Sequence, residues 1–367
     1  MLGVITLTKN YGFDASDRDD DIKIWQRPTL GMFQPDAITT YQNDGNNYVL
    51  TANEGDGRDY DGYSEEERFR DVEVDLKDFP NANYIQQQEV MGRLKMTSSQ
   101  GDLDGDGLYD EIYSFGARSF SIWDAFGNLV WDSGDQFEKV LQFYHPETFN
   151  FNNDDNDSRK SRSDDKGPEP EAIAVTEYGG RQYALIGLER VGGIMVYDIT
   201  NPYEPYFVNY LNNRNFDVDA ESANVGDLGV EDIKVIAAND NPTGYPLVVT
   251  ANEVSGTVSI FTMKSPWVTP FNNRVNTPTS NLYQASAFPN PFEDYVDIQY
   301  QLETDAAVLI ELYDVEGRKL AQLTEEQQVA GVHHFTYAKG LKALPEGIYF
   351  LRLQLGAAVE TVPLVKR

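Results

Sequence analysis

The 367-residue chain contains no cysteine, which excludes disulfide bonds, thiol catalysis and cysteine-ligated zinc. Histidine is nearly absent too. Only His145, His333 and His334 occur, so a catalytic triad or histidine-rich metal centre outside the C-terminal region would rest on His145 alone. Basic residues are scarce, with 29 Lys and Arg against 60 Asp and Glu and a formal net charge of −31. Such a surface repels nucleic acid and anionic lipid and suits an extracellular cation-binding protein, although acidity also serves solubility alone.

Long apolar runs are missing as well, and no stretch is long enough to predict a transmembrane segment. The first nine residues, M-L-G-V-I-T-L-T-K, lack the basic start, the apolar core and the cleavage site of a signal peptide. A protein that works outside the cell without disulfides needs another source of stability, and calcium is the usual one.

The C-terminal region contains an ordered series of motifs. They are F-P-N-P-F-E-D-Y-V-D-I-Q-Y-Q-L from Phe288, L-Y-D-V-E-G-R-K-L from Leu312, L-P-E-G-I-Y-F-L-R-L from Leu344 and a final V-P-L-V-K-R. This region resembles the C-terminal sorting domain (type A) of the type IX secretion system. The resemblance implies export by the type IX secretion machinery and a location outside the cell or on the outer-membrane surface. Because such cargo first needs a signal peptide, we expect the sequence to be an N-terminally truncated or processed form.

The rest of the chain predicts an all-β fold. Short β-branched and aromatic runs alternate with Gly, Asn, Asp and Pro, and helical periodicity is almost absent before residue 265. A phrase repeats: Y-V-L-T-A-N-E-G from Tyr48 returns as L-V-V-T-A-N-E-V from Leu247, and Y-A-L-I-G-L-E-R from Tyr183 has the same shape. Such repeats favour a β-propeller with about four readable blades, at 31–76, 90–132, 169–210 and 229–262. A β-sandwich is the alternative.

These patterns predict three segments. Residues 1–263 form the propeller-like body, 264–286 a linker rich in Pro, Asn, Thr and Ser, and 287–367 the sorting domain, a small Ig-like β-sandwich. Within the body, 150–167 is too polar for a core and predicts a long loop.

The body also resembles a known family. The phrases that carry the resemblance are D-A-S-D-R-D-D-D-I-K-I from Asp14, G-M-F-Q-P-D-A-I from Gly31, L-T-A-N-E-G-D-G-R-D-Y from Leu50 and G-L-E-R-V-G-G-I-M-V-Y-D from Gly187. Together they are similar to the choice-of-anchor I family of extracellular, propeller-like bacterial proteins. Its members share a body and carry different C-terminal anchoring or sorting modules.

The clearest candidate site is D-L-D-G-D-G-L-Y-D, which matches the calcium-loop pattern D-x-D-x-D-G-x-x-D. A hard cation takes six to eight oxygen ligands, and glycines allow the tight turn that folds them around one ion. Leu108 would contribute its backbone carbonyl. The predicted calcium ligands are Asp102, Asp104, Asp106, Leu108 and Asp110. The alternative is a solvated acidic turn.

A second candidate site follows from the repeats. An acid opens one predicted strand and a glutamate follows the next, at Asp36 and Glu54 (54 − 36 = 18), Glu171 and Glu189 (189 − 171 = 18), and Glu231 and Glu253 (253 − 231 = 22). Paired strands would bring these six carboxylates, here called the acidic ring, to one face as a pocket for a metal, a polar small molecule or a glycan. Further residues predicted to extend the pocket are Asn53, Arg58, Arg118, Arg190 and Asn252, with Asp164, Asp165, Lys166 and Glu169 approaching from the preceding loop. The competing interpretation is that these side chains only pair with each other.

Three functions are compatible with these features. The first is a secreted or cell-surface calcium-binding module that acts in binding or as a scaffold. The second is a calcium-dependent phosphoesterase, with metals in the acidic ring activating water. The third is a lyase or hydrolase that acts on polysaccharide through paired carboxylates. Tyr60, Tyr63 and Tyr113 are candidates for stacking on sugars, or for packing within the sheets.

Overall fold

The computed structural model describes residues 4–6, 11–263, 268–270, 286–288, 292–302, 304–314, 318–345, 347–356 and 358–366. The fold is all-β, with 43% strand and 8% helix in several sheets, as the sequence predicts. In the described part of the chain no closed barrel or propeller is detected. The chain divides into two compact units, one within residues 1–270 and the other within 271–367, with 206–209 grouped with the second. The linker prediction, 264–286, falls largely outside the described residues.

The first sheet of the body has the order β1-β2-β9-β8-β7. Its strands are β1 (Val4–Thr6), β2 (Leu30–Met32), β7 (Glu66–Arg68), β8 (Lys95–Thr97) and β9 (Tyr113–Ser114). A separate two-stranded ribbon pairs β5 (Asp59–Tyr60) with β6 (Tyr63–Ser64). The surrounding chain forms the short helices η1 (Phe69–Asp71) and α1 (Ala82–Ile85). Apolar side chains including Phe13, Phe33, Phe69 and Met96 form the core here.

The second sheet has the order β11-β10-β4-β3. Its strands are β3 (Ala37–Asn43), β4 (Asn46–Asn53), β10 (Ser119–Asp124) and β11 (Leu129–Asp132). Because β4 pairs with β10, residues 54–118 are an insertion between two neighbouring strands of one sheet. The prediction that 31–76 and 90–132 are separate blades is therefore wrong, since the two segments share this sheet and the first one.

The third and fourth sheets are antiparallel meanders in chain order. The third corresponds to the predicted unit 169–210, and the fourth extends the predicted unit 229–262 by one further strand at Val268–Pro270. The third contains β12 (Pro170–Tyr178), β13 (Arg181–Leu188), β14 (Ile194–Asp198) and β15 (Tyr206–Leu211). The fourth contains β16 (Val230–Ile236), β17 (Leu247–Asn252), β18 (Thr257–Met263) and β19 (Val268–Pro270). The helices between these strands and before them are α2 (Gln136–Tyr144), η2 (Pro146–Thr148) and η3 (Ala238–Asp240).

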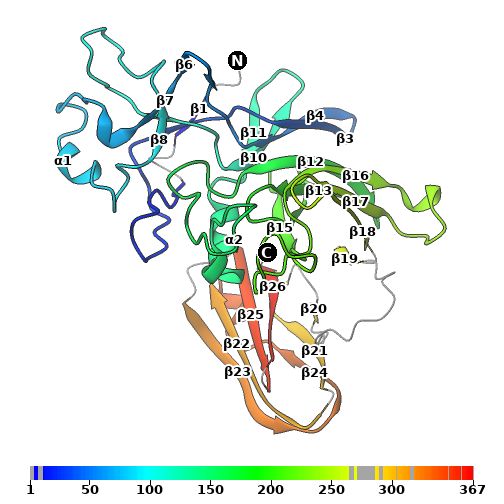
Figure 1. Ribbon diagram of the computed structural model, residues 1–367. Helices are drawn as coiled ribbons and strands as arrows, with labels where there is room; N and C mark the ends of the chain where they lie inside the picture. Colours follow the sequence, from blue (N-terminus) through cyan, green and yellow to red (C-terminus); the bar gives the residue numbers. More distant parts are fainter. Residues whose placement is uncertain are drawn as a thin grey trace. The chain divides into compact units, whose positions relative to one another are not determined.

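The first strands of the second, third and fourth sheets lie beside one another: β12 contacts β3 on one side and β16 on the other (Figure 1). Aromatic packing joins the second and third sheets, because Phe120 meets Tyr197 edge to face with ring centroids 4.9 Å apart. The starts of β3, β12 and β16 are thereby brought to one region of the body.

The C-terminal unit contains two sheets with orders β20-β21-β24 and β23-β22-β25-β26. The first is built from β20 (Ser286–Phe288), β21 (Val296–Leu302) and β24 (Gly331–Tyr337). The second is built from β22 (Ala306–Asp314), β23 (Lys319–Gln328), β25 (Gly347–Leu355) and β26 (Ala358–Lys366), and η4 (Leu341–Ala343) lies between β24 and β25. Alternate residues are buried, among them Val296 and Ile298 in β21 and Val308 and Ile310 in β22, so each sheet has one apolar face.

Candidate functional site

Strand register places the two acidic residues of each sheet at the same end of a pair of neighbouring strands. In the second sheet Ala37 pairs with Ala52, and the backbone N–H of Asp36 donates to the carbonyl of Ala52 at 3.0 Å. Asp36, just before β3, therefore lies across from Glu54, just after β4. The predicted spacing of 18 residues is the spacing that this register requires.

The third and fourth sheets repeat the arrangement with a β-bulge at the acid. The register shifts between Pro170 and Ala172, at Glu171, and between Val230 and Asp232, at Glu231. A bulge re-aims a side chain at the end of a strand pair. Glu171 and Glu231 thus occupy the positions equivalent to Asp36.

A left-handed backbone conformation two residues before each of these acids marks the same structural repeat. The φ angles are 34° at Gln34, 52° at Glu169 and 69° at Gly229. The carbonyls of Glu169 and Gly229 accept the N–H groups of Glu189 (2.9 Å) and Glu253 (2.7 Å). Positive φ is costly for any residue except glycine, so Gly229 is the relaxed version of a turn that Gln34 and Glu169 adopt under strain.

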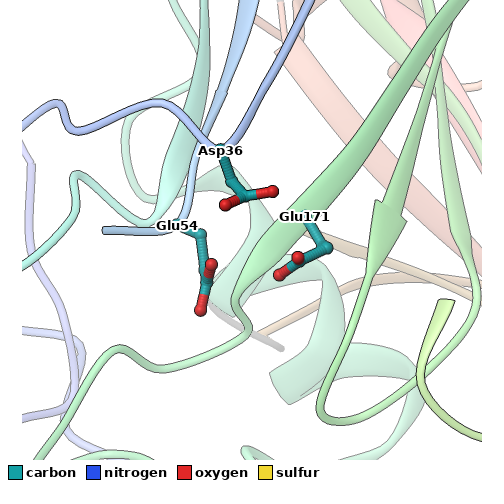
Figure 2. A group of neighbouring side chains, drawn as sticks. All are labelled: Asp36, Glu54 and Glu171. Carbon is teal, nitrogen blue, oxygen red and sulfur yellow. The ribbon is translucent and has the colours of Figure 1, made fainter. Parts of the chain in front are cut away.

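Three carboxylates from two sheets converge at the centre of the acidic ring (Figure 2). Asp36, Glu54 and Glu171 each place an oxygen within 4.8 Å of the others. Glu54 and Glu171 are buried, whereas Asp36 is exposed. The group therefore has two buried carboxylates below one that is open to solvent.

Burial and the neighbouring carboxylates raise the pKa values of Glu54 and Glu171. Burial, followed by the charge of Glu54 and a hydrogen bond with it, raises the pKa of Glu171 to about 10. Burial also raises the pKa of Glu54 to about 7, although Lys166 opposes this. The pair consequently holds a proton at neutral pH, and a bound cation would compete with that proton.

Glu169 forms a second centre directly beside the first, where Glu54, Glu169 and Glu189 again have oxygens within 4.8 Å of one another. Glu169 is fully buried and contacts three cations. The distances to it are 2.6 Å from Arg162 Nε, 3.3 Å from Lys166 Nζ and 2.9 Å from Arg190 Nε. Burial disfavours its ionisation, but Arg162, Lys166 and Arg190 together lower the pKa of Glu169 to about 2.

The same cations reach the neighbouring acids. Lys166 also bonds Glu54, and Arg190 Nε lies 3.0 Å from Glu189. The amide of Asn153 donates to Glu189 at 2.7 Å. Burial raises the pKa of Glu189 to about 7 in spite of Arg190.

The segment 150–167 holds these cations in place. It has no regular secondary structure, as predicted, yet Lys160, Asp164, Asp165 and Lys166 are all buried. Arg118 anchors it by donating to the carbonyls of Ser163 (2.9 Å) and Asp165 (2.7 Å).

Not every residue predicted for the pocket joins the acidic ring. Arg118 also bonds Glu138 at 2.7 Å, so its buried guanidinium is a structural anchor. Arg58 pairs with Glu65 at 2.7 Å on the separate β5–β6 ribbon. Asn53 and Asn252 donate within their own sheets, to Ser121 Oγ (2.8 Å) and Thr257 Oγ1 (3.1 Å).

Glu231 and Glu253 form an exposed outer part of the acidic ring. Partial burial, a hydrogen bond with Glu253 and the charge of Asp36 raise the pKa of Glu231. Asp36 therefore links the fourth-sheet pair electrostatically to the centre.

Arg162, which contacts Glu169, is a residue of the site that the sequence did not predict. Its only signal is its place in R-S-D-D-K-G-P-E-P-E.

The predicted calcium loop lies between β8 and β9 and has the geometry of a preformed turn. Asp102 accepts from Gly105 N at 2.7 Å and Gly107 N at 3.0 Å. Both glycines have left-handed φ angles, 82° at Gly105 and 91° at Gly107. A Cβ atom at either position would meet no neighbouring atom, so glycine is favoured by the backbone conformation and not by lack of space.

Side-chain oxygens of Asp102, Asp104 and Asp110 lie within 4.8 Å of one another. Asp106, a predicted ligand, is not in this group, and its carboxylate accepts Leu108 N at 2.8 Å. A cavity of about 270 Å³ adjoins the loop; its lining residues are Ser98, Ser99, Gln100, Asp102, Gly107 and Tyr109. Asp110 also belongs to a second carboxylate group with Asp75 and Asp78.

Among the described helices, none is long and apolar enough to cross a membrane.

Comparison with known proteins identifies both parts of the chain. Residues 1–202 match the model of the Choice-of-anchor I domain, and residues 286–367 match that of the Secretion system C-terminal sorting domain. Gigasin-3a of Magallana gigas is 30% identical over 232 residues, covering 56% of this chain and 81% of that protein. The Mesenchyme-specific cell surface glycoprotein of Strongylocentrotus purpuratus is 28% identical over 238 residues, covering 54% of this chain but only 31% of the relative.

One solved structure with detectable similarity is the dimeric latent PorU from Porphyromonas gingivalis. It is 13% identical, with a TM-score of 0.21, and the match covers 33% of this chain and 12% of PorU. A score this low carries no inference about the fold or the site.

Proposed function

The chain belongs to the choice-of-anchor I family and ends in a type IX secretion sorting domain, and from this premise we propose a secreted or cell-surface calcium-binding protein whose β-propeller-like body serves as a binding or scaffold module. The sorting domain indicates delivery by the type IX machinery to the extracellular space or the cell surface. The observation that carries the calcium proposal is the convergence of Asp102, Asp104 and Asp110 within a D-x-D-x-D-G loop.

Three features support the propeller-like interpretation. The third and fourth sheets are meanders in chain order, their first strands lie beside β3, and the acid-bearing turn repeats at Asp36, Glu171 and Glu231. Blades of a propeller share this radial arrangement. The two half-buried sheets of the C-terminal unit support an Ig-like sandwich in the same way.

A cation is a better ligand for the acidic ring than an anion. Each of the three cationic side chains that the structure describes around Glu169 already contacts at least two carboxylates, as Lys166 does with Glu54 and Glu169. A phosphate group would have to displace those contacts. This favours binding over calcium-dependent phosphoester hydrolysis, which release of phosphate from p-nitrophenyl phosphate and phytate, with and without calcium, tests directly.

Neutralising the calcium loop should remove most of the stabilisation that calcium gives. For a site with Kd of about 10⁻⁴ M, 10 mM calcium is about 100 Kd and stabilises by about 2.7 kcal/mol, which raises Tm by about 5 °C or more. In the double variant Asp102→Asn and Asp104→Asn both ligand charges are lost. The amide oxygen at position 104 can still accept from Asp106 N, and the one at position 102 can keep one of its two turn hydrogen bonds. We expect its calcium-dependent rise in Tm to fall by at least half.

Exposed Asp217→Asn is the matched control and should keep the full rise. Scanning calorimetry in calcium and in chelator measures both. An equal rise in wild type and loop variant would refute calcium binding at this loop, and no rise in either would refute the calcium proposal as a whole.

A further inference from the structure

The β5–β6 ribbon presents two tyrosines to solvent. Tyr60 and Tyr63 are cross-strand partners, so their rings project from the same face. Their ring centroids are 5.5 Å apart and their planes differ by 34°. Tyr60 is 62% exposed and Tyr63 40% exposed. Two exposed aromatic side chains in contact with each other form a candidate binding surface.

The base of the ribbon is fixed, so the aromatic pair is held in position. Arg58 N donates to Glu65 at 2.8 Å, its guanidinium pairs with the same carboxylate at 2.7 Å, and Glu65 N donates back to the carbonyl of Arg58 at 2.9 Å. Glu65 is buried and also accepts Thr97 Oγ1 at 3.2 Å, which ties the ribbon to β8. The guanidinium of Arg58 lies 5.4 Å from the ring centroid of Tyr63 and steadies it.

The ribbon belongs to the insertion 54–118 and takes no part in the second sheet, which closes through β4 and β10 without it. Its side chains are therefore not needed to complete that sheet. Tyr113, the third candidate for sugar stacking, differs: it is half-buried in β9 and its hydroxyl donates to Glu111. The structure thus separates a presented pair from an ordinary strand residue.

We propose that the β5–β6 ribbon is a carbohydrate-binding platform for neutral polysaccharide. Aromatic faces stack on the C–H faces of sugar rings, and two adjacent exposed rings offer contact area to consecutive sugars of a chain. Asp59 and Asp61 are exposed on the same ribbon and accept hydrogen bonds from sugar hydroxyls, while the half-exposed guanidinium of Arg58 donates. These carboxylates, together with exposed Asp56, repel uronate, sulfate and anionic lipid, so the ligand is uncharged.

Affinity electrophoresis tests the platform, because the acidic 367-residue protein migrates well in native gels. The gels contain laminarin, galactomannan, hydroxyethylcellulose or soluble starch, with alginate as the anionic probe. We expect wild type to be retarded by at least one neutral polymer and not by alginate. The double variant Tyr60→Ala and Tyr63→Ala should raise the apparent Kd at least tenfold.

Two further variants make the outcome specific. Tyr84, which is 55% exposed elsewhere in the body, provides a control: Tyr84→Ala should bind as wild type does. Tyr60→Phe with Tyr63→Phe keeps the stacking faces and should retain most binding. The proposal is overturned if none of the four neutral polymers retards wild type, or if the double alanine variant binds equally well. It is also overturned if that variant changes only the sedimentation coefficient, which would make the ribbon a contact between copies. Circular dichroism confirms that each variant is folded.

Discussion

Replacing Glu169 with glutamine is expected to lower the free energy of unfolding by about 3 kcal/mol at pH 7. The carboxylate is fully buried and contacts Arg162, Lys166 and Arg190. Glutamine has nearly the same shape but no charge, so the three cations would lose their shared partner without gaining water. Removing one partner of a buried ion cluster is among the most damaging single changes in a protein. Urea unfolding at pH 7 measures the effect.

Acid titration distinguishes the charge of Glu169 from its shape. Its pKa in the folded protein is lowered to about 2, from 4.5 in an ordinary glutamate. The unfolded state therefore binds the proton first, and the stability that this group provides is full above about pH 4.5 and is lost as the pH falls toward 2. The Gln variant should lack this part of the acid-induced loss. Exposed Glu147→Gln is the control, and a loss under about 1 kcal/mol at pH 7 for Glu169→Gln would contradict a central role.

The sheets that could be predicted from sequence are those whose strands are consecutive. The phrase around Tyr183 and the one around Leu247 each lie inside one meander, so local periodicity was sufficient. The phrase around Tyr48 fails as a unit because its partner strand, β10, arrives only after the insertion 54–118. Sequence pattern shows that a strand exists, but strand pairing across a long insertion depends on tertiary packing.

The candidate site divides in a similar way. The spacing of Asp36 and Glu54, repeated at Glu171 and Glu189, follows from strand register and was visible in the sequence. Of the three cations around Glu169, Arg190 and Lys166 were predicted to reach the ring, whereas Arg162, from the irregular segment 150–167, was not. The polar composition of this segment predicts only a loop, although Arg118 and internal pairing bury much of it. Charge pairing within an irregular segment has no periodic signal.

The acidic ring makes an opposite prediction for Glu171, where glutamine should stabilise the protein in alkali. Burial and Glu54 raise the pKa of Glu171 to about 10, so the folded state retains a proton that the unfolded chain releases above about pH 4.5. Wild-type stability should therefore fall as the pH rises from about 4.5 toward 10. Glutamine mimics the protonated acid at every pH. We expect Glu171→Gln to unfold like wild type at pH 5 and to be more stable by at least about 2 kcal/mol at pH 9.

Calcium adds the decisive comparison, because a cation bound by Asp36, Glu54 and Glu171 would replace the proton. Calcium should then restore wild-type stability at pH 9 more than at pH 5, and Glu171→Gln should lose this pH-dependent gain. Exposed Glu177→Gln is the matched control and should follow wild type throughout. The loop variant Asp102→Asn and Asp104→Asn serves as the background, so that only the ring contributes. Parallel stability curves for wild type and Glu171→Gln between pH 5 and 9 would show that Glu171 ionises freely and that its crowding with Glu54 has no energetic consequence.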